Sequence, residues 1–242
     1  MKYKTIVIVV MCIVIAFIFM SNMYSRCPDN KWARLVEECG RVLDKVRGMP
    51  DSTIPEGVLL DAKAIGIFPS TISAGLGLGG EYGQGIIMVK DKNSGRWSSP
   101  SIFTLAGGSI GWQIGGQATD IVLIFRDQQS VSAILSGKLK LGADASVAAG
   151  PVGRNASAAT DVQFKGGILS YSMSRGLFIG AKLEGAVLTQ HWDGNEGLYG
   201  RKLSAQEILF EHKTKMPRCA RRILRALSRY RMLMYILNRF PG

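Results

Sequence analysis

The chain has 242 residues, 47% apolar and 20% charged, so it is long enough for a sizeable core and too apolar for a disordered chain. Its net charge of +12 lies mostly at one end: residues 212–242 hold nine bases and no acid, whereas the rest holds 21 bases against 18 acids. A nearly neutral body excludes the evenly spread positive charge of a whole-surface nucleic-acid binder, so we expect no nucleic-acid partner.

The N-terminal residues carry the pattern of a membrane span. Ile6–Met20 is an unbroken apolar run that follows Lys2 and Lys4, and the uncharged stretch Thr5–Ser25 ends at Arg26. As a helix, this stretch reaches roughly 30 Å, which matches the thickness of a hydrocarbon core. The small residues typical of a signal-peptidase site are missing, which favours an uncleaved anchor over a cleaved signal peptide.

The sequence gives only a weak indication of the side of the membrane on which the body lies. Bases flank the span at both ends, so the positive-inside rule does not place the N-terminus. The short basic region before the apolar run is typical of an export signal. We therefore expect a single-pass N-terminal anchor with an exported body, which would be periplasmic in a bacterium.

A helix is predicted directly after the span. Asp29 or Asn30 provides its N-cap, and Gly48 with Pro50 ends it. Its apolar residues fall on one side at helical spacing, as in a helix packed on a domain. The bases on its other side are either solvated or meet an anionic membrane surface. The apolar side comprises Trp32, Leu35, Val36, Cys39, Val42, Leu43 and Val46, and the basic side comprises Arg34, Arg41 and Lys45, with Lys31 nearby.

The body has the pattern of a β-rich domain. A short helix over Pro55–Lys63 comes first, and a second helix lies near Gln128–Leu135. Glycines recur every second residue in Gly75–Gly79 and Gly83–Gly85, which leaves one strand face bare and lets another backbone approach closely. We expect an α+β fold: a strongly curved, mostly antiparallel, glycine-rich β-sheet or barrel with N-terminal helices. The predicted strands are Ile65–Phe68, Tyr82–Lys90, Ser101–Leu105, Ile121–Arg126, Ile168–Met173 and Leu177–Thr189.

Two apparent catalytic motifs lack the context that their chemistry needs. Gly75–Gly80 satisfies GxGxxG and Gly107–Gly111 satisfies GxSxG around Ser109, but both motifs work only where a strand turns sharply into a helix. Strand-like or glycine-rich sequence follows each motif, so a serine hydrolase using Ser109 is only a distant alternative. The four cysteines and two histidines are too scattered for a disulfide framework or a metal site, and we expect neither metal nor cofactor.

The C-terminal segment has the pattern of a basic amphipathic helix that begins after Pro217. An apolar seam on one side suits a helix that lies in a membrane interface, or one that packs on the body or on a partner helix. A nucleic-acid tail is a weaker alternative. The seam comprises Ala220, Ile223, Leu227, Tyr230, Met234 and Leu237, and the opposite side carries Arg218, Arg221, Arg222, Arg225 and Arg229.

Six motifs in the body resemble the SYLF lipid-binding domain family, and the resemblance covers about Asp29 to Gly200. It implies a non-enzymatic domain that binds membrane lipids, notably phosphoinositides in eukaryotic relatives, and that binds and bundles actin in some fungal ones. It assigns lipid binding to the N-terminal amphipathic helix, here Asn30–Arg47. The motifs are Ile54–Lys63 with Ile67–Pro69, Gly79–Gly85, Trp97–Pro100, Gly111–Gly115 with Asp120–Ile124, Ser146–Arg154, and Tyr171–Phe178 with Leu183–Gly185.

Together these features predict three segments: an anchor over residues 1–28, a SYLF-like domain over 29–200 and a basic helical extension over 201–242. The expected function is non-enzymatic binding of anionic membrane phospholipids. The alternative is a scaffold that recruits a protein partner, actin-like in some relatives, through the C-terminal helix. The candidate lipid-binding residues are Lys31, Arg34, Arg41, Lys45, Arg218, Arg221, Arg222, Arg225 and Arg229.

Overall fold

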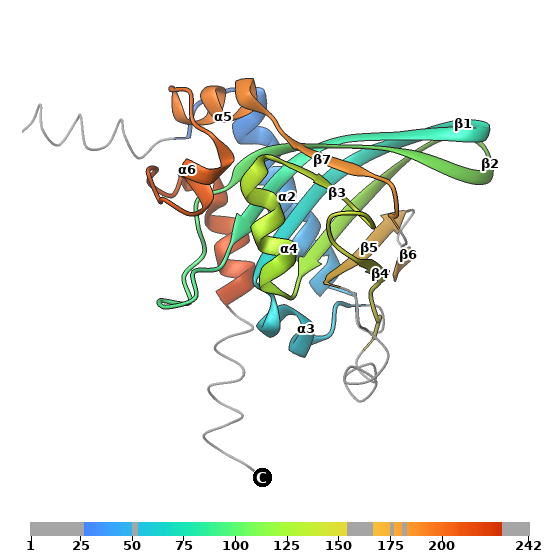
Figure 1. Cartoon of the computed structure of the whole chain (residues 1–242), viewed down its shortest axis with the longest axis horizontal. Coiled ribbons are helices and arrows are strands. Elements are labelled where there is room, and N and C mark those ends of the chain that lie inside the picture. The colour runs from blue at the N-terminus through green and yellow to red at the C-terminus, as the bar shows by residue number, and fades with distance from the viewer. Residues whose placement is uncertain (1–26, 50–52, 154–166, 175–176, 181–182, 229–242) are drawn as a thin grey trace, which may run out of the picture.

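The computed structural model describes residues 27–49, 53–153, 167–174, 177–180 and 183–228. These residues form a strongly curved sheet with helices packed on it (Figure 1). The strands are β1 (Ala64–Val89), β2 (Ser101–Phe125), β3 (Lys138–Lys140), β4 (Val147–Ala149), β5 (Ile168–Ser174), β6 (Leu177–Gly180) and β7 (Val187–Gln190). The helices are α2 (Lys31–Arg47), α3 (Glu56–Asp61), α4 (Gln128–Ala133), α5 (Trp192–Tyr199), α6 (Ala205–Leu209), and the 3-10 turns η1 (Ile134–Ser136) and η3 (Arg218–Ala220). Residues 221–228 continue η3 as an α-helix, and we call residues 218–228 the C-terminal helix.

The sheet is mostly antiparallel, as the sequence predicted, and β4 with β5 is its parallel pair. Its strands follow the order β3-β7-β2-β5-β4, with β1 also paired to β2 and β6 to β5. The predicted α+β class with a strongly curved sheet and N-terminal helices is therefore confirmed for the described residues.

A long hairpin of β1 and β2 forms the centre of the sheet and extends to one side of the molecule (Figure 1). The two strands pair from Ala64 opposite Phe125 to Ile87 opposite Ser101, with two register shifts. The sequence predicted shorter, separate strands here. That prediction was wrong because glycines weaken the strand pattern, yet the paired neighbour supplies the backbone hydrogen bonds that keep both strands continuous.

The two ends of β1 lie against each other where the hairpin curls. A Cβ added to Gly85 would overlap the carbonyl oxygen of Ile67 and lie 2.8 Å from the Cα of Phe68. A Cβ on Gly83 would lie 3.0 Å from the Cβ of Thr71. The expectation that alternate glycines permit close backbone approach is therefore confirmed at these two positions.

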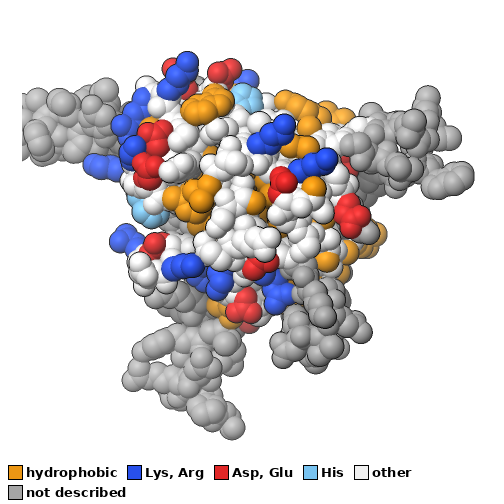
Figure 2. Space-filling model, in the orientation of Figure 1, with side chains coloured by type: hydrophobic (Ala, Val, Ile, Leu, Met, Phe, Trp, Pro, Cys, Tyr) orange, Lys and Arg blue, Asp and Glu red, His pale blue; other side chains and the backbone are white. Residues whose placement is uncertain are grey.

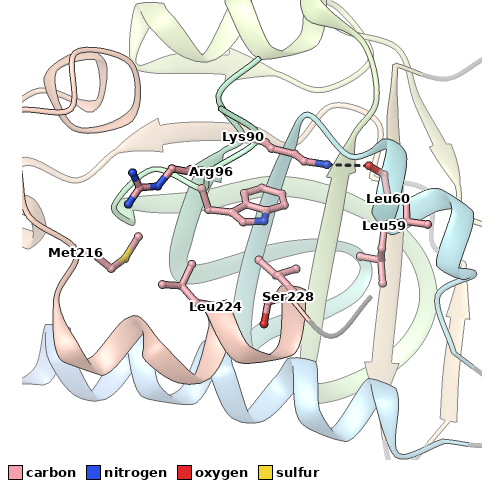
Figure 3. A pocket seen from close by; sticks show the side chains of 10 residues that line it. Leu59, Leu60, Lys90, Arg96, Met216, Leu224 and Ser228 are labelled. Carbon is pink, nitrogen blue, oxygen red and sulfur yellow. Dashed lines mark hydrogen bonds between the residues drawn. The ribbon is translucent and has the colours of Figure 1, made fainter. Parts of the chain in front are cut away.

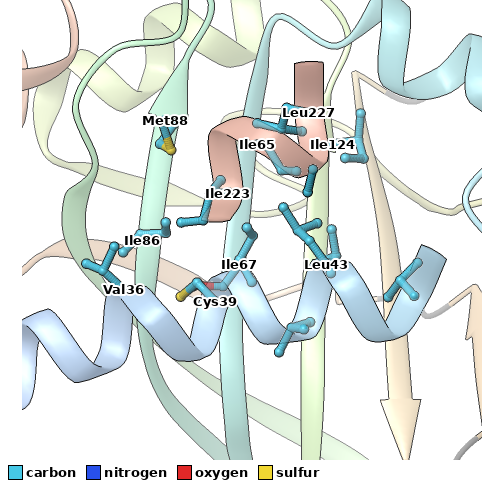
Figure 4. Close-up of a cluster of buried hydrophobic side chains, with 14 of the residues drawn as sticks. Val36, Cys39, Leu43, Ile65, Ile67, Ile86, Met88, Ile124, Ile223 and Leu227 are labelled. Atoms are coloured by element: carbon cyan, nitrogen blue, oxygen red, sulfur yellow. The ribbon is translucent and has the colours of Figure 1, made fainter. Parts of the chain in front are cut away.

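Alternate side chains of the strands enter two separate apolar clusters. Ile65 and Ile67 face α2, α3 and the C-terminal helix, whereas Ala64 and Phe68 face α4, η1 and α6. We call the first cluster the α2 cluster; Figure 4 shows α2 and the C-terminal helix meeting over its strands. Both faces of the sheet are thus covered, as the period of two along a strand requires.

The predicted helix after residue 29 is α2, and its bounds follow from its caps. Asn30 is the N-cap, because its side chain accepts hydrogen bonds from the backbone of Trp32 and Ala33, both at 3.0 Å. At the other end, the N–H of Gly48 donates to the carbonyl oxygens of Asp44 and Lys45. The predicted apolar side is confirmed as the buried side, with Leu35 partly exposed.

The apolar seam of the C-terminal helix packs on the body. Ala220, Ile223 and Leu227 are buried in the α2 cluster. This part of the seam therefore packs on the body, as one of the predicted alternatives has it, and is not exposed to enter a membrane interface. The later seam residues Tyr230, Met234 and Leu237 lie outside the described residues.

A disulfide joins Cys27 to Cys219, with 5.8 Å between the two Cα atoms. The sequence predicted no disulfide framework and gave no sign of this bond, because the two cysteines are 192 residues apart and meet only when the C-terminal helix packs near the start of α2. Cys39 is a buried free thiol, and burial raises its pKa well above the usual value.

The predicted membrane span over residues 1–28 lies almost wholly outside the described residues. Among the residues that the structure describes, no helix combines the length and apolar character needed to cross a bilayer.

We expect loss of the disulfide to lower the free energy of unfolding by about 2–5 kcal/mol, because the bond closes a very long loop in the unfolded chain. Urea unfolding of a fragment beginning at Arg26, with and without reductant, measures this change. The double variant Cys27→Ser/Cys219→Ser should lose the response to reductant. If reductant leaves the urea midpoint of the wild-type fragment unchanged, the disulfide is absent or does not stabilise the fold.

Gly85→Ala should destabilise the same fragment by about 1–3 kcal/mol, because the new methyl group has no space beside the backbone of Ile67. The matched control is Gly57→Ala in α3, where no atom lies within 4 Å of the added Cβ. Alanine favours a helix over glycine, so the control should be as stable as the wild type or more so. Equal urea midpoints for the Gly85 variant and the wild type would rule out the close approach within β1.

Candidate functional site

The four predicted bases of α2 all lie on its solvent-exposed side. This follows from the helical period, because the apolar residues between them are buried against the sheet. Arg34 is exposed, and the ammonium of Lys31 lies 4.3 Å from the ring centroid of Trp32, within range of a cation–π contact.

Acids accompany two of these bases. Arg41 pairs with Glu38 one turn earlier, at 3.3 Å, and Lys45 pairs with Asp120 of β2 at 3.6 Å. The pair of Arg41 with Glu38 is exposed and contributes little to stability, whereas the side chain of Asp120 in the second pair is only 14% exposed. The pairs lower the local excess of positive charge but leave both bases at the surface.

The arginines of the C-terminal helix are likewise exposed. Arg222 reaches α2, where its Nε lies 2.5 Å from an oxygen of Asp44. No ion pair with an acid of the described chain is formed by Arg218, Arg221 or Arg225. Arg229, the remaining candidate, lies outside the described residues.

The structure brings the two basic segments onto one face of the molecule. Both helices contribute to the α2 cluster, and a Cβ added to Gly40 would lie 2.9 Å from the Cβ of Arg222, so the helices are in close contact. We call the exposed sides of these two helices the basic face. Its members are Lys31, Arg34, Arg41, Lys45, Arg218, Arg221, Arg222 and Arg225.

The charge of the C-terminal segment is partly compensated before the basic face begins. Lys213 lies 3.0 Å from Glu207 and 2.8 Å from Glu211. Hydrogen bonds from the backbone of Ser204 and from Lys213 lower the pKa of Glu207 to about 2, so this acid is charged at neutral pH. In the described part of this segment, Lys213 is thus paired, whereas Lys215 and, in the C-terminal helix, Arg218, Arg221 and Arg225 form no ion pair with a described acid.

The opposite face of the molecule also carries charges of both signs. Figure 2, in which α4 lies toward the viewer, shows Lys and Arg side chains interspersed with Asp and Glu side chains over that surface. Lys138 and Lys140 of β3 are exposed there, and Leu139 between them is buried in the cluster beneath α4.

Neither catalytic motif has the geometry of a catalytic site. Ser109 lies within β2, opposite Gly79 of β1, so the chain continues as a strand where a nucleophile elbow would turn into a helix. Gly75–Gly80 likewise lies within β1. Among the described residues, no three His, Cys, Asp or Glu side chains are grouped so that they could hold a metal ion.

Sequence reasoning missed the acids that neutralise parts of the basic face. The spacing of Glu38 and Arg41 on one helix was a usable signal. No sequence signal indicated the pairs of Asp120 with Lys45 and of Asp44 with Arg222, because each pair joins elements that are far apart in the sequence.

Comparison with known proteins places the chain among relatives of similar sequence. Protein YSC84 of Saccharomyces cerevisiae is 35% identical over 181 residues, which cover 74% of this chain and 38% of that protein. SH3 domain-containing YSC84-like protein 1 of Bos taurus is 33% identical over 196 residues, 81% of this chain and 56% of that protein. The human protein of the same name is 34% identical over 191 residues, which cover 78% of this chain and 54% of that protein.

The chain thus spans between about a third and just over half of the length of these relatives. None of their names describes an enzyme. Residues 106–230, about half of the chain, match the family Ysc84, which is described as "Las17-binding protein actin regulator". With its curved glycine-rich sheet and its match over these residues, the chain belongs to the Ysc84/SYLF family.

Proposed function

We propose that the chain binds anionic phospholipids at a membrane surface through its basic face, without catalysing a reaction. The observation that carries this proposal is the placement of eight exposed bases on two helices that share one buried cluster. Near an anionic bilayer each base contributes about 1 kcal/mol, and salt weakens the attraction. The common cluster fixes the two helices together, so their bases act on the same surface.

The contact is expected to be electrostatic rather than inserted. The apolar sides of α2 and of the described C-terminal helix are buried against the sheet, so no apolar stripe of these residues is left to enter the bilayer. Affinity should therefore depend on lipid charge and ionic strength more than on acyl-chain packing.

The apolar run near the N-terminus supports the same proposal. A span over residues 1–28 would hold the body at the bilayer, and attachment raises the local concentration of the basic face so that weak contacts become occupied. The disulfide between Cys27 and Cys219 favours an exported body, since such bonds persist in oxidising compartments.

A second candidate function is recruitment of a protein partner, because the family is described as Las17-binding and as an actin regulator. The exposed side of the C-terminal helix is rich in arginine, so a partner docking there would present an acidic surface. Such binding would require the arginines but not lipid, which separates the two candidates.

The lipid proposal is tested by flotation of the fragment beginning at Arg26 with vesicles of phosphatidylcholine alone or with phosphatidylserine. Truncation of the C-terminal segment is unsuitable, because Ile223 and Leu227 belong to the core. We expect Arg218→Gln/Arg221→Gln/Arg225→Gln to lower flotation with the anionic vesicles several-fold and to reduce its dependence on salt, because three unpaired charges are lost.

The matched control removes three exposed charges elsewhere: Lys138→Gln/Lys140→Gln/Lys202→Gln. These lysines adjoin Leu139 and Leu203, which belong to the other cluster. It should float nearly as well as the wild type. Equal loss in both triple variants would indicate a response to net charge alone, and equal flotation with both vesicle types would exclude the electrostatic contact. A protein recovered stoichiometrically without lipid, and lost in the arginine variant, would favour the scaffold.

A further inference from the structure

A pocket of about 340 Å³ lies between α3, the connection from β1 to β2, and the C-terminal helix (Figure 3). It is separate from the basic face, because none of the eight bases of that face lines it. No motif indicated it, since its walls come from chain segments that are far apart in the sequence.

The walls of the pocket are mainly apolar and partly open to solvent. Leu60, Trp97, Met216 and Leu224 are only half-buried, although Trp97, Met216 and Leu224 pack against the α2 cluster. A concave apolar surface of this kind gains free energy when an apolar guest displaces its water. The lining therefore favours a hydrocarbon over a polar ligand.

Two cations lie at the edge of the pocket and no carboxylate is among its lining residues in the described chain. The ammonium of Lys90 donates a hydrogen bond to the carbonyl oxygen of Leu60 at 2.9 Å, which holds that wall in place. Arg96 is exposed and extends on the side of Met216, as Figure 3 shows. A guanidinium in this position is suited to a carboxylate, with which it makes paired hydrogen bonds.

We propose that this pocket binds the single hydrocarbon chain of a fatty acid, with the carboxylate at Arg96. The volume lies at the lower end of the range of roughly 300–1,000 Å³ typical of ligand pockets, which suits one chain rather than a two-chain phospholipid. The site is independent of lipid binding by the basic face, because it uses different side chains and a different ligand.

The experiment uses the full chain in vesicles of phosphatidylcholine, which carry no net charge, and a palmitate with a photoreactive group on its chain. After illumination, mass spectrometry maps the labelled peptides. We expect labelling in the peptides that contain Leu60, Trp97 and Leu224. Labelling confined to residues 1–28, or spread without preference, would overturn the proposal.

Two variants fill the pocket from opposite walls: Leu224→Trp and Leu60→Trp. Each should reduce labelling of the pocket peptides several-fold, and the retained disulfide between Cys27 and Cys219 reports that the fold is intact. The matched control is Leu135→Trp, since Leu135 is 40% exposed in η1 and packs outside the pocket. Unchanged labelling in both folded pocket variants would overturn the site.

The role of Arg96 is tested by competition. Unlabelled palmitate should displace the probe from the wild type far better than palmityl alcohol, and Arg96→Gln should remove that difference. Equal displacement by acid and alcohol in the wild type would overturn the assignment of an anionic head group. Palmitate adds negative charge to the vesicles, so the competition is repeated with Arg218→Gln/Arg221→Gln/Arg225→Gln. This variant should keep the preference for the acid over the alcohol, which separates the pocket from the function proposed for the basic face.

Discussion

The packing of α2 and the C-terminal helix against one face of the curved sheet is the contact on which the rest of the molecule depends. It buries Val36, Cys39, Ile223 and Leu227 in one cluster with the strands. Burial of apolar side chains of this size stabilises a fold by about 1.5–3 kcal/mol each, which is far more than the exposed ion pairs on the same helices can contribute. Apolar packing therefore sets the positions of the two helices, and with them the positions of the bases on their exposed sides.

The same contact makes the C-terminal helix part of the folded body. The disulfide to Cys27 fixes its beginning, and the close approach of Gly40 to Arg222 brings it against α2. Because the apolar side of this helix is used internally, its outer side can carry arginines. An amphipathic pattern that also suits a membrane interface is thus satisfied by the protein's own core in the residues that the structure describes.

The curvature of the sheet depends on glycine at a few positions. Gly83 and Gly85 allow the two ends of β1 to meet, so a hairpin of two long strands can curl into a half-barrel. Side chains at these positions would hold the backbones apart. Curling in turn creates the face that α2 covers, which links the glycine pattern to the position of the basic face.

The sequence by itself determined the local features: α2 with its cap at Asn30, its buried and basic sides, and the strand-rich body. These follow from side-chain periods of 3.6 and 2.0 residues, which are set by backbone geometry within one element. Only the tertiary structure decided that Cys27 meets Cys219, that Asp44 neutralises Arg222, and that a pocket forms beside the C-terminal helix. Such contacts join residues as far apart as 192 positions, and they depend on how whole elements pack rather than on any pattern along the chain.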